Sequence, residues 1–259
     1  MSSPAPLLDF FRRGEVARDV RLLAAQGVLA PRAHEQIAIL VLLVDDKDAE
    51  VRQTALATIE RIPVDALRAY LGRSDVPVGI REFFGDRGVF PAEIPLITAD
   101  DPLFDVTADE EDDLEIEAGD DSTETLLQKL QKMNITQRLK AAMRGSREVR
   151  AALIRDPNKM IAAAVLSSPK VTEAEVEGFA KMATVSEDVL RTIAMNRAWL
   201  KNYAVVLALV KNPKCPVGLS LNLLNRLNDR DLSGVSTDRN VPDPLRTAAR
   251  RKVVLGEKR

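Results

Sequence analysis

Ser146-Arg-Glu-Val-Arg-Ala-Ala-Leu-Ile154 and Ser186-Glu-Asp-Val-Leu-Arg-Thr-Ile-Ala194 are two copies of one pattern, 40 residues apart. In each copy a serine precedes charged residues and then apolar residues at spacings of three and four. The apolar spacing is that of a helix with one buried face. The pair therefore predicts a helix that recurs along the chain.

A second pair of segments matches in type at a spacing of 44 residues. These segments are Ala162-Ala-Ala-Val-Leu-Ser-Ser-Pro169 and Val206-Leu-Ala-Leu-Val-Lys-Asn-Pro213, and the four extra residues lie around Trp199. A partial third copy runs from Asp229-Arg-Asp-Leu232 to Val241-Pro-Asp-Pro-Leu-Arg-Thr-Ala-Ala-Arg-Arg251. A unit of 40 to 44 residues, made of a helix, a Pro-containing turn and a helix, lies in the range of HEAT and armadillo repeats.

The N-terminal half carries a related pattern in Asp46-Lys-Asp-Ala-Glu-Val-Arg-Gln-Thr-Ala-Leu-Ala-Thr-Ile59. This segment resembles the second half of a HEAT repeat, in which an acidic turn precedes a Val-Arg pair and a stripe of small and aliphatic residues. The segment 133–251 also resembles a group of uncharacterised bacterial helical-repeat proteins. That resemblance covers about half of the chain and implies helical repeats, but it implies no activity.

Strand signals are almost absent, because β-branched alternation never extends over five residues. Beyond the quoted segments, helices are expected over residues 15–26, 33–44, 64–71 and 76–84. Gly27 is a suitable C′ residue for the first of these. Thr172-Glu-Ala-Glu175 is a capping box that predicts a further helix start. The expected fold is all-α.

Charge is segregated along the chain. Residues 1–121 contain 12 basic and 26 acidic side chains, whereas residues 122–259 contain 25 basic and 13 acidic ones. Most of the acidity lies in Asp100–Asp121, where 12 of 22 residues are Asp or Glu. We therefore expect two HEAT-like α-solenoid modules, residues 1–85 and 122–259, joined by an acidic, Pro-containing and disordered linker over residues 86–121.

The sequence offers little for catalysis, and we expect no enzyme, cofactor or metal site. His34 is the one histidine and Cys215 the one cysteine, so no metal-ligand cluster is expected. Gly-x-Gly and Gly-Lys-Ser/Thr phosphate loops are absent. Trp199 is expected to pack between repeats, and the helix-spaced Glu173 and Glu177 to form a solvated face.

The start of the sequence lacks the basic and apolar regions of a signal peptide, and its longest apolar run, Ile37–Val44, is far shorter than the ~20 residues of a membrane span. A cytoplasmic location without membrane association is therefore expected.

Basic side chains concentrate in two stretches of the C-terminal half and form a candidate surface for an anionic partner. Helical spacing places several of their guanidinium groups close together, where mutual repulsion favours an anion. The alternative is that these side chains solvate different helix faces. The candidate residues are Arg138, Arg144, Arg147, Arg150, Arg155, Lys159, Arg246, Arg250 and Arg251.

Two functions fit this organisation. The first is a non-catalytic protein-interaction scaffold whose basic module binds an acidic protein segment or the chain's own acidic linker. The second is a nucleic-acid-binding helical-repeat module that the linker inhibits. A tethered linker acts at an effective concentration on the order of mM, which is sufficient for weak self-binding. A linker that only separates the modules is equally compatible with the sequence. We expect no small-molecule substrate.

Overall fold

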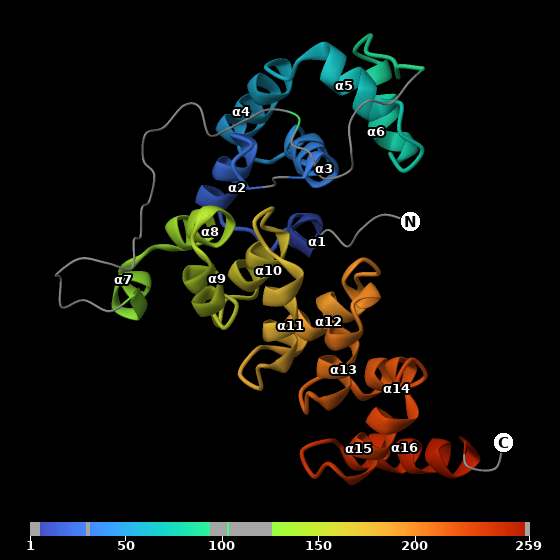
Figure 1. Cartoon of the computed structure of the whole chain (residues 1–259). Helices are drawn as coiled ribbons and strands as arrows, with labels where there is room; N and C mark the ends of the chain where they lie inside the picture. The colour runs from blue at the N-terminus through green and yellow to red at the C-terminus, as the bar shows by residue number, and fades with distance from the viewer. Residues whose placement is uncertain (1–5, 30–31, 94–102, 104–125, 257–259) are drawn as a thin grey trace. The chain divides into compact units, whose positions relative to one another are not determined.

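A computed structural model of the chain describes residues 6–29, 32–93, 103 and 126–256 (Figure 1). Across these residues the protein is helical and contains no β-strand, which confirms the expected all-α class. The chain divides into two compact units, residues 1–153 with 163–170, and residues 154–162 with 171–259. Within the described ranges, no helix is both long and apolar enough to cross a lipid bilayer.

The helices that lie wholly in the first unit are α1 (Pro6–Arg13), α2 (Arg18–Ala25), α3 (Ala33–Leu43), α4 (Ala49–Glu60), α5 (Val64–Leu71), α6 (Val78–Gly85), α7 (Leu126–Lys132), α8 (Ile135–Arg144) and α9 (Arg147–Leu153). The chain continues through α10 (Lys159–Ser167), whose residues the two units share. The second unit then contains α11 (Glu173–Lys181), α12 (Glu187–Met195), the 3-10 helix η2 (Trp199–Lys201), α13 (Tyr203–Lys211), α14 (Val217–Leu224), α15 (Asp229–Thr237) and α16 (Asp243–Gly256).

The first unit is organised around α3. The helices α1, α2, α4 and α6 all pack against it, so apolar residues such as Ile37 and Leu40 are fully buried. Because so many neighbours surround α3, its polar residues Glu35 and Gln36 are also only 2% exposed. Polar groups buried in this way require hydrogen-bond partners to offset the loss of water.

The helix signals of the N-terminal half match the structure closely. The Asp48 side chain caps α4 by accepting the amide hydrogens of Glu50 and Val51, and Val51 is buried on the predicted stripe. Gly27, the expected C′ residue after α2, has a φ of 80°, a left-handed conformation that glycine adopts without steric cost.

The segment predicted as a linker begins with ordered contacts. The Ala92 amide donates to the Arg68 carbonyl at 2.9 Å. Leu103 is only 4% exposed, and its amide lies 3.4 Å from Gln36 Oε1. Apart from Leu103, the acidic stretch Asp100–Asp121 lies outside the described residues.

The recurring serines quoted above are equivalent helix caps. The side chains of Ser146 and Ser186 each accept the amide hydrogen of the third residue on, at 3.4 Å in both cases. Asn228 caps α15 in the same way, at 2.8 Å. These caps lie 40 and 42 residues apart, so one hydrogen-bonding pattern begins α9, α12 and α15.

A matching turn follows each of these three helices, ten residues after its cap. Asp156, Asn196 and Asp238 each accept the amide hydrogen two residues ahead, at distances of 2.8, 3.0 and 2.9 Å. Such Asx turns replace the backbone hydrogen bonds that end with a helix. The four-residue insertion around Trp199 contains η2, and Trp199 itself is 9% exposed.

The turns that precede α11 and α14 are fixed by buried polar side chains. Ser168 Oγ donates to the Met143 carbonyl at 2.8 Å. Asn212 Nδ2 donates to the carbonyls of Ala180 and Met182, at 2.8 and 3.1 Å. The predicted capping box at Thr172 is present and begins α11.

Candidate binding surface

The structure places the nine predicted basic residues in three different environments. Six are exposed, two are half-buried and one is buried. The exposed residues are Arg144, Arg147, Arg155, Lys159, Arg250 and Arg251; Arg138 and Arg246 are half-buried, and Arg150 is buried. The set is divided between the two compact units: Arg138, Arg144, Arg147 and Arg150 lie in the first, and the other five lie in the second.

Arg150 points into the protein. It lies four residues after the cap Ser146, where the equivalent residues after the caps of α12 and α15 are the buried Leu190 and Leu232. Its guanidinium Nη1 donates to the Gly145 carbonyl at 2.8 Å, and its exposed fraction is 5%. Helical spacing from Arg147 predicted a shared surface, whereas Arg150 occupies a core position.

Several of the other predicted cations make local contacts. Lys159 Nζ lies 2.7 Å from Asp188 Oδ2, Arg246 pairs with Asp243 on the same helix, and Arg250 Nε donates to the Ser236 carbonyl at 3.1 Å. Such exposed ion pairs contribute only ~0–1 kcal/mol each to stability, so a partner's carboxylate can replace one at small cost.

Arg144 and Arg147 are exposed and lie three residues apart in the chain. They lie at the end of α8 and the start of α9, and neither guanidinium group contacts a carboxylate among the described residues. Their charges are therefore directed to solvent in this part of the structure.

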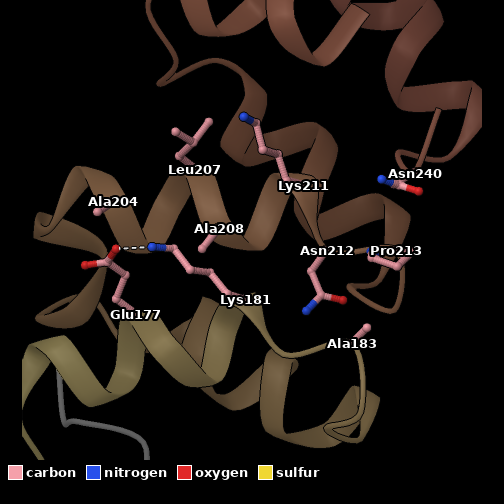
Figure 2. Close-up of a pocket in the computed structure, with 10 residues that line it drawn as sticks. All are labelled: Glu177, Lys181, Ala183, Ala204, Leu207, Ala208, Lys211, Asn212, Pro213 and Asn240. Atoms are coloured by element: carbon pink, nitrogen blue, oxygen red, sulfur yellow. Dashed lines mark hydrogen bonds and ion pairs between the residues drawn. The ribbon is translucent and has the colours of Figure 1, made fainter. Parts of the chain in front are cut away.

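The second unit has a groove over α11 and α13, with a volume of about 550 Å³ (Figure 2). The groove is open because Ala204 and Ala208, one turn apart on α13, have small side chains that do not fill it. Lys211 lies at the C-terminal end of α13, and Asn240 lines the groove from the turn before α16.

The charged side chains of the groove differ in their contacts. Lys181 Nζ lies 2.5 Å from Glu177 Oε1, one turn before it on α11, and Figure 2 shows this pair along one side of the groove. The Lys211 ammonium has no carboxylate partner within the described ranges. Nearby, Asn212 has its amide occupied by backbone carbonyls, which holds the turn at the groove's end rigid.

Sequence reasoning missed this groove. The spacing of Lys181 and Lys211 from other basic residues gives no signal, and neither was among the candidate residues. Their proximity to one hollow follows from the packing of α11 against α13. Of the alanines that line the groove, Ala208 lies in a segment quoted for the repeat pattern, whereas Ala183 and Ala204 lie in none.

The face of α10 that corresponds to the groove face of α13 is covered. The 44-residue spacing aligns Ala163 with Leu207 and Ser167 with Lys211. Ala163 and Ser167 are 9% and 1% exposed, whereas Leu207 is half-buried and Lys211 is exposed. One face is therefore packed and its counterpart is open.

A buried carboxyl group lies beside that covered face. Glu35 Oε1 accepts the Leu7 amide hydrogen at 3.0 Å and so caps the start of α1. Burial raises the pKa of Glu35 to about 7; the charge of Arg32, the amide hydrogen bonds and the Ser167 hydroxyl oppose this rise. Near neutral pH this carboxyl group titrates inside the first unit.

The lone histidine is half-buried and the lone cysteine is buried. His34 Nδ1 lies 3.1 Å from the Tyr70 hydroxyl, and burial lowers the pKa of His34. Cys215 is 2% exposed, and burial raises the pKa of its thiol, which disfavours the nucleophilic thiolate. The described ranges contain no group of three or more His, Cys, Asp or Glu side chains placed to hold a metal ion.

Comparison with protein-family models, with curated proteins and with solved structures gives no match for this chain.

Proposed function

We propose that this protein is a non-catalytic scaffold built on HEAT- or armadillo-like helical repeats, and that its basic C-terminal part binds acidic segments of partner proteins. The observation that carries the proposal is the recurrence of one local design: a cap at Ser146, Ser186 and Asn228, and an Asx turn ten residues after each.

Recurrence of caps and turns at near-constant spacing supports a repeat architecture. Each copy of the pattern lies in a set of three α-helices: α8–α10, α11–α13 and α14–α16. The residues four and seven positions after each cap are buried in all three copies. Repeats of this kind bury a continuous core and present an extended surface for binding.

Charge supports an anionic partner. Residues 122–259 carry an excess of 12 basic side chains, and Arg144 and Arg147 face solvent. A surface of one sign raises the local concentration and the association rate of an oppositely charged partner.

The proposal is tested with the full chain and a fluorescein-labelled peptide that has the sequence of residues 104–121, which combines carboxylates with apolar side chains. Fluorescence anisotropy is measured at several salt concentrations. We expect saturable binding that weakens with salt, and no binding of the peptide in which every Asp and Glu is replaced by Asn and Gln. Wild-type protein that fails to bind the acidic peptide at 50 mM salt would refute the proposal.

A matched pair of variants tests the arginine surface. Arg144→Glu combined with Arg147→Glu is expected to weaken peptide binding several-fold. Arg68→Glu combined with Arg12→Glu is the control: both of these arginines are exposed and lie in the near-neutral N-terminal part. An equal effect of the two double variants would contradict a role for Arg144 and Arg147.

Nucleic acid is the competing ligand. Short double-stranded DNA and single-stranded RNA are measured in the same assay, and phosphate contacts give binding that falls steeply with salt. Nucleic-acid binding stronger than peptide binding would replace the proposed function with the alternative one. Deletion of residues 104–121 from the full chain tests competition by the acidic segment, since removing a competitor raises the affinity for added peptide.

A further inference from the structure

We propose that the groove over α11 and α13 is the docking site for the acidic segment of the partner protein. Lys211 and Lys181 pair with the carboxylates of that segment, and the alanine floor receives its apolar side chains. This inference rests on the proposed function and assigns it a location. The occupant is an extended or helical segment of a partner protein in which acidic and apolar residues are interspersed.

The floor of the groove suits apolar side chains. Ala204 and Ala208 lie on one face of α13, and Ala183 closes the end nearest Asn212. A hollow of about 550 Å³ is within the range of ~300–1,000 Å³ that is typical of binding pockets, which are mostly apolar with a few placed polar groups. Small residues are what leave this space open between the two helices.

The charges at the groove select for carboxylates. The ammonium of Lys211 has no ionic partner among the described residues, so a carboxylate there gains a contact without breaking one. Lys181 is paired with Glu177 one turn away, but the Lys181 side chain is 63% exposed. An exposed pair of that kind contributes little to stability, so Lys181 can turn to an incoming carboxylate.

The covered counterpart on α10 indicates the kind of occupant. There the position aligned with Lys211 is Ser167, which lies beside the buried carboxyl group of Glu35 on α3. In the first unit, therefore, α3 with the carboxyl group of Glu35 lies beside this face of α10. On α13 the same face is open, and a lysine replaces the serine at the aligned position. A carboxylate-bearing segment complements both the shape and the charge of the open face.

Three variants of the full chain test the site with the labelled peptide of residues 104–121. Lys211→Glu reverses the unpaired charge, and Ala204→Phe fills the floor. Arg230→Glu is the matched control, because Arg230 is exposed on α15, does not line the groove and has the same sign of charge as Lys211. Circular dichroism and thermal unfolding of each variant establish that the fold is retained.

We expect Lys211→Glu and Ala204→Phe each to weaken binding by about tenfold or more, and Arg230→Glu by less than about threefold, since a charge outside the contact acts only through screened long-range attraction. Equal weakening by Lys211→Glu and Arg230→Glu, with Ala204→Phe unchanged, would overturn the docking site while leaving the proposed function intact. Absence of peptide binding by the wild-type chain would overturn both. If one variant unfolds, the other together with the control still decides between these results.

Discussion

Glu35 is expected to make the stability of the first unit depend on pH in an unusual direction. Its carboxyl group is 2% exposed and accepts the Leu7 amide hydrogen, and its pKa rises from 4.5 to about 7 because of burial. The folded protein therefore holds the proton more tightly than the unfolded chain. Between those two pKa values, raising the pH destabilises the folded state, because a proton is lost on unfolding.

The size of this effect follows from the shift. Each pKa unit corresponds to 1.36 kcal/mol, so the shift of Glu35 corresponds to a loss of ~3 kcal/mol of unfolding free energy as the pH rises from below 4.5 to above 7. Glu35→Gln removes the ionisable group and keeps an oxygen that can accept the Leu7 amide hydrogen. Relative to the wild type, the variant should therefore gain ~3 kcal/mol over that pH range.

Urea unfolding of the wild type and Glu35→Gln, followed by circular dichroism at pH values from 4.5 to 8, measures this difference. Fluorescence of Trp199, which lies in the second unit, serves as the internal reference, since that unit does not contain Glu35. A free-energy difference between the two proteins that stays constant with pH would refute the reasoning. So would a wild type that gains stability relative to the variant as pH rises.

Three further predictions concern buried groups within one or the other unit. Gly145→Ala should cost ~1–3 kcal/mol in urea unfolding, because an added Cβ would lie 2.8 Å from Val149 Cγ1 and also against backbone; an unchanged midpoint would contradict this packing. Asp46→Asn keeps an oxygen for the turn but removes the charge 2.8 Å from Arg21 Nε, and it should lower stability by ~1–3 kcal/mol, because among the described residues the guanidinium is left largely buried without a carboxylate and keeps only the Val16 carbonyl as an acceptor; a loss below 0.5 kcal/mol would show that the pair is dispensable. Cys215 should react with a thiol reagent roughly a hundredfold more slowly in the native protein than in urea, as expected for a buried thiol of raised pKa; equal absorbance-monitored rates would mean that the thiol is accessible.

Local signals in the sequence were sufficient to predict many helix starts and ends. The capping box at Thr172 and the C′ glycine at Gly27 occur where they were expected, and the helix predicted over 64–71 matches α5. These features depend on residues a few positions apart, whose hydrogen bonds form whatever the rest of the chain does. The recurring serines at 146 and 186 marked a repeated segment in the sequence, and the structure shows that they cap helices.

The direction in which a side chain faces was harder to predict. Arg150 has helical spacing from Arg147, yet it occupies the core position taken by leucine in the two later copies of the pattern. Glu35 lies in a first helical turn, where a carboxylate is usually exposed, but four helices enclose α3 and bury it. Both outcomes depend on which helices pack around a given face, and periodicity within one helix carries no information about its neighbours.

The sequence by itself determined that this protein is all-α and that helical segments recur along its C-terminal half, because those properties follow from helix periodicity. Only the tertiary structure decided that Ser167 is buried while the aligned Lys211 borders an open groove. The physical reason is that exposure depends on contacts between helices distant in sequence: Glu35 of α3 lies beside Ser167, whereas within the described residues no carboxylate pairs with Lys211.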